Sequence, residues 1–147
     1  MKRAFKLLVA LSFLPFFGVA QTMTTTGNWD NSANWSAGNI GDIITENVSL
    51  GNNIDPTIRT GFNYTIGNLT TGNDNNLIIQ TGASLTLGAS GTPKNFTTNN
   101  NTVLTIAGTL TIWGDLIVNN NITWNVTGTV IIKGNVNLGN NASITVG

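Results

Sequence analysis

A twenty-residue repeat in residues 104–147 constrains the fold more than any other feature of this chain. Shifting the sequence by twenty residues aligns Gly108 with Gly128 and Gly114 with Gly134, and it aligns six apolar positions with six others. The aligned apolar pairs are Leu104/Trp124, Ile106/Val126, Leu110/Val130, Ile112/Ile132, Leu116/Val136 and Val118/Leu138. A period of this length is typical of solenoids, in which each repeat packs on its neighbours.

Each repeat contains three short segments in which apolar and polar residues alternate. Alternation with a period of two indicates half-buried strands. Glycine and asparagine lie between the segments and supply the bends, because both tolerate left-handed backbone. The pattern therefore predicts an all-β chain folded as a three-sided parallel β-helix of about four to five coils. The unequal sides and the Thr and Asn beside the inward aliphatics favour a right-handed helix over a left-handed one.

The earlier coils are less regular than the repeat. Residues 48–76 form the first expected coil, in which Pro56 argues against a regular central strand over residues 54–58. Residues 77–103 form the second coil. From Leu77 to Leu104 is 27 residues, seven more than the basic period, and most of the excess fits an outward loop in residues 88–95. We therefore expect a signal peptide in residues 1–20, an N-terminal cap in 21–47 and β-helix coils in 48–147, regular from 104.

The first twenty residues have the composition of a secretory signal. A basic start precedes an apolar run over residues 7–17, and small residues follow at 18–20. An N-terminal membrane anchor is the alternative interpretation. Cleavage before Gln21 would leave three bases and six acids, a net charge of −3. The expected location is secreted or on the outer cell surface, with no transmembrane span after cleavage and no nucleic-acid partner, because phosphate binding needs clustered Lys and Arg.

The residues needed for common catalytic chemistry are missing from the sequence. The chain has no His and no Cys, which excludes Ser-His-Asp and Cys-His machinery and the usual zinc sites. We therefore predict no enzyme activity, no catalytic residues, no cofactor and no metal site. Asp115 and Lys133 are expected to form a surface ion pair. The loop at residues 73–76 is interpreted as a turn, with a calcium site as the alternative.

Two polar patterns invite a more specific interpretation. Asparagine runs recur at one corner of the coil, where stacked amides predict a hydrogen-bonded ladder in addition to simple turn propensity. The ladder candidates are Asn99, Asn100, Asn101, Asn119, Asn120, Asn121, Asn140 and Asn141. Outward threonines resemble the array of ice-binding β-helices, but at an offset of twenty Thr111 meets Ile131 and only Thr109 and Thr129 stack. Strand propensity therefore explains the outward threonines.

Tryptophans mark both the cap and the coils. Trp29 and Trp35 lie among turn formers, and we interpret them as a cap over the open core rather than as a sugar-stacking platform. Trp113 takes an outward or corner position aligned with Lys133. These three rings are the candidates for ligand contact.

The cap segment also resembles a known family. Its pattern is Gly27-Asn28-Trp29, then Trp35-Ser36-Ala37-Gly38, Gly41-Asp42 and Val48-Ser49-Leu50. This is similar to the N-terminal region of secreted, repeat-rich, β-helical, adhesin-like surface proteins of gliding and related Gram-negative bacteria. The proline that usually precedes the aspartate is absent, and Val48 follows Asp42 by six positions. The resemblance implies a secreted or surface protein, part of a larger adhesin-like chain or a small one that uses the scaffold alone.

Three functions remain open from the sequence. The first is a non-catalytic structural or adhesive surface module. The second is a carbohydrate-binding module that uses exposed tryptophans to bind cell-surface glycans. The third is a filament subunit whose partner is another copy of the same chain.

Overall fold

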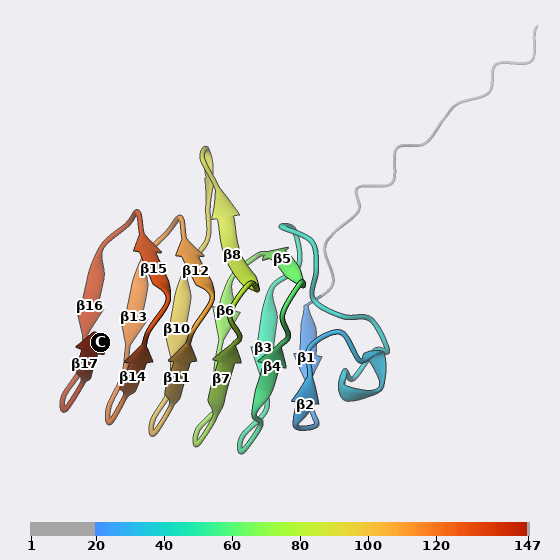
Figure 1. Cartoon of the computed structure of the whole chain (residues 1–147), viewed down its shortest axis with the longest axis horizontal. Coiled ribbons are helices and arrows are strands. Elements are labelled where there is room, and N and C mark those ends of the chain that lie inside the picture. Colours follow the sequence, from blue (N-terminus) through green and yellow to red (C-terminus); the bar gives the residue numbers. More distant parts are fainter. Residues whose placement is uncertain (1–19, 147) are drawn as a thin grey trace, which may run out of the picture.

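The short alternating segments fold into strands that stack into a rod. A computed structural model describes residues 20–146, and in it every long-range strand pair of the rod is parallel (Figure 1). The predicted all-β parallel β-helix is therefore confirmed. The predicted signal peptide falls almost wholly on residues outside the described range.

Three parallel sheets form the sides of the rod. Sheet A contains β1 (Gln21–Met23), β3 (Val48–Leu50), β6 (Leu69–Thr70), β10 (Phe96–Thr98), β13 (Leu116–Val118) and β16 (Val136–Leu138). Sheet B contains β2 (Gly27–Asn28), β4 (Pro56–Ile58), β7 (Asn76–Ile79), β11 (Val103–Ile106), β14 (Thr123–Val126) and β17 (Ser143–Val146). Sheet C contains β5 (Asn63–Ile66), β8 (Ser84–Ala89), β12 (Thr109–Ile112) and β15 (Thr129–Ile132).

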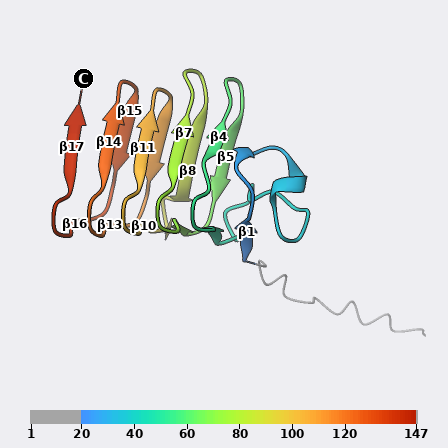
Figure 2. The same cartoon turned by 90° about the horizontal axis from the view of Figure 1, so that it is seen from below.

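The order of the strands gives about four complete turns. Coils β3–β4–β5, β6–β7–β8, β10–β11–β12 and β13–β14–β15 each contribute one strand to every sheet. At the two ends of the described rod, β1 and β16 extend sheet A, and β2 and β17 extend sheet B (Figure 2). The coil count agrees with the lower end of the predicted range.

The predicted register is confirmed in the regular part. Leu104 pairs with Trp124, Leu110 with Val130 and Leu116 with Val136, each twenty residues on. The longer step from Leu77 to Leu104 is also found as a direct pair. Its excess residues project as a hairpin in which β9 (Thr92–Pro93) pairs antiparallel with the end of β8 (Figure 1).

Two details of the first coil differ from the prediction. Residues 56–58 form β4, a central strand between β2 and β7, although Pro56 argued against it. The proline is tolerated because it is the first residue of the strand. In addition, β1 and β2 of the expected cap segment already join sheets A and B, so the coil architecture begins before Val48.

The inward residues form one continuous apolar core from Met23 to Val126. Trp124 is 2% exposed and pairs with Leu104 on one side and Ile144 on the other. Each coil adds its inward pair to this column, and burial of an aliphatic side chain contributes about 1.5–3 kcal/mol. The core and the backbone ladder hold the chain together without disulfides.

The repeated glycines are needed for a different reason from the one expected. None of Gly108, Gly114, Gly128 and Gly134 has a left-handed φ. Their common feature is contact with the backbone of the preceding coil. A Cβ on Gly108 would lie 2.4 Å from the carbonyl oxygen of Ala83, and one on Gly128 would lie 2.1 Å from that of Gly108. In the regular coils the left-handed bends are made instead by the last residue of each Asn run, with φ of 56° at Asn101 and Asn121.

Candidate functional site

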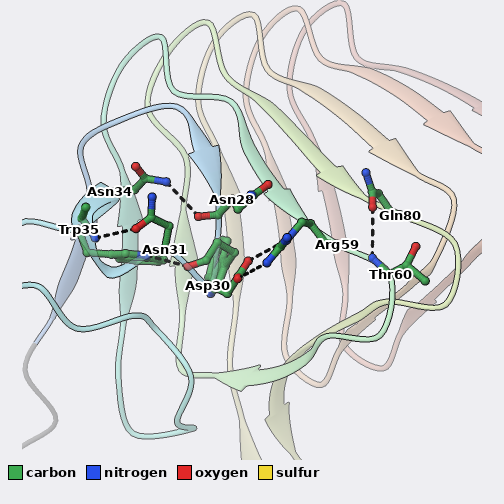
Figure 3. Close-up of polar contacts among 10 residues, drawn as sticks. Asn28, Asp30, Asn31, Asn34, Trp35, Arg59, Thr60 and Gln80 are labelled. Atoms are coloured by element: carbon green, nitrogen blue, oxygen red, sulfur yellow. Dashed lines mark hydrogen bonds and ion pairs between the residues drawn. The ribbon is translucent and has the colours of Figure 1, made fainter.

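The N-terminal end of the rod is closed by the two tryptophans of the cap. The 3₁₀ turn η1 (Ser32–Asn34) folds the segment back, and the indole N–H of Trp35 donates to the Trp29 carbonyl at 2.8 Å (Figure 3). The indole N–H of Trp29 donates to the Gly41 carbonyl at 2.8 Å. The two rings meet edge to face with centroids 5.0 Å apart, a favoured aromatic geometry.

The positions of these rings correct the sugar-platform interpretation. Trp29 is fully buried and Trp35 is 4% exposed, so neither ring offers a free face to a ligand. Both indole N–H groups are already used inside the cap. A Cβ on Gly41 would lie 2.4 Å from Val48 and 3.4 Å from Trp35, which explains the glycine of the cap motif. Trp29 and Trp35 therefore cover the core.

A depression of roughly 380 Å³ lies on the outside of the cap. Its lining includes three carboxylates, from Asp30, Asp42 and Glu46. Asp30 is already paired with Arg59, whose guanidinium donates to both carboxylate oxygens (Figure 3). This hydrogen bond raises the pKa of Arg59 above its ordinary value. Across residues 20–146 no cluster of three or more acidic, His or Cys side chains is placed to hold a metal ion.

The only tyrosine of the chain, Tyr64, lies beside the cap, and its pKa is raised there. Tyr64 is 7% exposed, and its ring lies 6.1 Å from that of Trp29. Burial raises the pKa of Tyr64 to about 12, and the nearby charges of Asp30 and Asp42 act in the same direction. The phenol is thus kept neutral because the site disfavours a buried negative charge.

Alkaline pH should therefore weaken the fold through Tyr64. Between pH 10 and about 12 the unfolded chain releases the phenol proton while the folded chain keeps it, so stability falls as the pH rises. We expect a loss on the order of 2 kcal/mol in the free energy of unfolding over this interval. Urea titrations at several pH values measure it, with tyrosinate absorbance reporting Tyr64 alone. A Tyr64→Phe variant with the same pH dependence would contradict the assignment.

Trp113 is the one tryptophan that is partly exposed. It follows β12, and the Lys133 ammonium lies 5.8 Å from its ring centroid, within cation–π range. The expected ion pair between Asp115 and Lys133 is wrong. Asp115 instead accepts hydrogen bonds from the backbone and side-chain N–H groups of Asn135, at 2.8 and 3.2 Å. The coil register places Asn135, not Lys133, directly beside Asp115.

The asparagine candidates lie on successive coils at the corner between sheets A and B. Asn119 Nδ2 donates to Asn99 Oδ1 at 3.1 Å, and Asn121 Nδ2 donates to Asn101 Oδ1 at 3.2 Å. Asn141 continues the outer column to Asn121 at 3.5 Å. In the middle column a side-chain oxygen accepts from a backbone N–H instead of a side-chain amide. Asn120 Oδ1, for example, accepts from the backbone N–H of Asn140 at 3.2 Å. Asn100 belongs to this middle column through its backbone N–H, which donates to the Asn73 side chain.

The loop considered for calcium is the start of the same column. Asp74 Oδ1 accepts from Asn101 Nδ2 at 2.9 Å, and Asp74 has a left-handed φ of 56°. Its carboxylate therefore occupies the position that an asparagine amide takes on later coils. This contact assigns Asp74 to a turn.

A second amide column was missed by the sequence analysis. At the corner between sheets C and A, the side-chain oxygen of every member but the last accepts from the backbone N–H of the next member at 2.8–2.9 Å. Its members are Asn47, Asn68, Asn95, Asp115 and Asn135. The regular spacing of Asn95, Asp115 and Asn135 was the available signal. The earlier steps of 21 and 27 residues concealed the rest.

Asn101 provides a test of the ladder. Replacing it with alanine removes two side-chain hydrogen bonds and places alanine in left-handed backbone. We expect the free energy of unfolding to fall by about 2 kcal/mol. Asn101→Gly keeps the backbone conformation accessible and should lose only about 1 kcal/mol. Urea unfolding of the two variants measures the difference. Equal losses would show that the backbone conformation contributes nothing.

Comparisons with known proteins were made at the levels of family, sequence and structure. No family model, characterised protein or solved structure matches the chain. Within residues 20–146 no helix has the length and hydrophobicity required to cross a membrane.

Proposed function

We propose that this chain is a non-catalytic structural or adhesive module of the cell surface or the secreted space. The observation that carries the proposal is the chemistry of the rod. Backbone ladders and amide columns run along it, its outward positions are mostly Thr, Ser and Asn, and the described charged groups are few. A hydrogen-bonded rod with few charges fits a stalk or a contact surface better than it fits a reaction centre.

The adhesin-like resemblance supports the same proposal. The structure gives its motif a physical role, because Trp29, Trp35 and Gly41 together close the first coil. A capped solenoid presents its sides while its N-terminal end stays closed to other strands. The apolar leader in residues 7–17 supports export.

Expression in a Gram-negative host tests the export and the surface location. We expect the mature chain to begin at Gln21 and to be in the medium or digestible by protease added to intact cells. A leader variant with two charges in the apolar run serves as the control and should stay inside with Met1 retained. A native chain that remained intracellular and unprocessed would contradict the proposal.

Adhesion requires a separate measurement. Particles coated with the purified chain should attach to cell or extracellular surfaces more than particles coated with the urea-unfolded chain. Equal attachment by both would contradict an adhesive role and leave the structural one.

Carbohydrate binding is the second candidate, now limited to one ring. Trp113 is partly exposed and lies beside the exposed Lys133, a pairing that suits an acidic sugar. Glycan-array binding that disappears in Trp113→Ala would support this function. Binding that persists would exclude Trp113 as the contact.

A further inference from the structure

The outward side chains of sheet C form two straight columns along the rod. The first column consists of Asn63, Ser84, Thr109 and Thr129. The second consists of Thr65, Thr86, Thr111 and Ile131. Six of these eight side chains carry a hydroxyl, and none is ionisable. Figure 1 shows the strands β5, β8, β12 and β15 in this order along the rod.

Strand geometry turns these columns into a two-dimensional array. Neighbouring strands lie about 4.8 Å apart, and outward residues on one strand lie about 6.6 Å apart. Threonine has few χ1 rotamers, so each methyl and hydroxyl has a restricted direction. The inward side of the sheet is fully packed, because Leu85, Leu87, Leu110 and Ile112 are all 0% exposed. The array therefore has a rigid backing.

The other two faces lack this arrangement. Strands of sheet A contain two or three residues and present one outward residue each, so these outward residues form a single column that includes Thr70 and Thr97. The outward positions of sheet B are interrupted by Ile78 and Val103. Sheet C alone among the described faces has two adjacent columns rich in hydroxyls.

We propose that the outer face of sheet C binds the surface of ice. A crystal face of water is uncharged and repeats in two dimensions, and a matching protein surface needs regularly spaced hydroxyls and methyls without charges. None of the eight side chains is aromatic, and the partly exposed ring of Trp113 lies beyond the end of β12, outside the two columns. The columns themselves offer no ring on which a sugar could stack, which favours ordered water over polysaccharide. The inference concerns a different face from the cap and does not depend on the proposed surface function.

A matched pair of double variants tests the face. Thr86→Lys with Thr111→Lys places two charges on adjacent strands of sheet C, whereas Thr70→Lys with Thr97→Lys places the same two on adjacent strands of sheet A in the same coils. All four threonines are half-buried and outward. Each double variant carries the same pair of neighbouring lysines, so its cost to stability should be similar.

The measurements are uptake of the labelled full chain into a slowly growing ice hemisphere and inhibition of ice recrystallisation. We expect wild type and the sheet A variant to enter the ice and to keep ice grains small, and the sheet C variant to lose both activities. Circular dichroism and urea midpoints show whether the variants fold. If the sheet C double variant does not fold, Thr111→Val, which keeps the shape and removes one hydroxyl, should reduce ice uptake.

Three results would overturn the proposal. The first is a folded wild type that the ice excludes. The second is equal ice uptake by both double variants. The third is binding to a crystalline polysaccharide that only the sheet C variant loses, without ice uptake by wild type, which would assign the face to a glycan.

Discussion

Trp29→Ala is expected to lower the free energy of unfolding by about 3–5 kcal/mol, the usual cost of removing a large buried aromatic side chain. Trp29 is fully buried and contacts Trp35 and Tyr64 through its ring. Its indole N–H also satisfies the Gly41 carbonyl, which would lose this partner in the variant. The apolar core of the first coil, which Trp29 covers, would then be exposed to solvent.

Urea unfolding with Trp113→Ala as the matched control measures this effect. Trp113 is partly exposed and contributes a cation–π contact worth about 0.5–1 kcal/mol, so its removal should cost little. Trp29→Phe should lie between the two, because it keeps a ring and loses the hydrogen bond. A Trp29→Ala variant no less stable than Trp113→Ala would show that the cap is unnecessary for the rod.

Gly108→Ala is expected to cost about 3 kcal/mol or more, although it adds one methyl group. A Cβ at this position would lie 2.4 Å from the carbonyl oxygens of both Gln80 and Ala83 and 2.9 Å from Ile79. Those carbonyls belong to the backbone of the preceding coil and cannot rotate away. The two coils must separate at this corner, which lengthens the hydrogen bond from Gly108 N–H to the Ile79 carbonyl.

Gly61→Ala separates coil contact from backbone conformation. Gly61 has a φ of +87°, and nothing lies within 4 Å of its added Cβ. Its substitution should cost about 1–2 kcal/mol from strain alone. Urea midpoints of the two variants give the comparison. If Gly108→Ala were the milder change, close approach of coils would not explain the repeated glycine.

The two types of bend illustrate what a sequence pattern can and cannot assign. Gly108 and Asn121 both recur at twenty-residue intervals, and from sequence alone both are expected to adopt left-handed backbone. The structure separates them, because Asn121 has a φ of 56° whereas Gly108 does not have a left-handed φ and contacts the neighbouring coil. Whether a residue can adopt left-handed backbone depends on its own type and can be expected from sequence. Whether its Cα lies against another coil depends on a segment about 25 residues earlier, which for Gly108 includes Ala83.

The ion-pair prediction failed for a related reason. Asp115 and Lys133 differ by eighteen positions, so they are near neighbours on adjacent coils. The register nevertheless places Asp115 in a hydrogen bond with Asn135, and Lys133 over the ring of Trp113. An offset of two residues along a bend was enough to separate the charges.

The repeat by itself determined the architecture of this protein. Alternation fixed the strands, and the spacing of Leu104, Leu110 and Leu116 fixed three sides, because period-two segments can bury only one face. Only the tertiary structure decided what the outer faces present. Thr65, Thr86 and Thr111 form one column through steps of 21 and 25 residues, which a fixed offset of twenty cannot detect. The strands keep their register through parallel pairing while insertions between them vary in length, so the hydroxyl array exists in space and not in the spacing of the sequence.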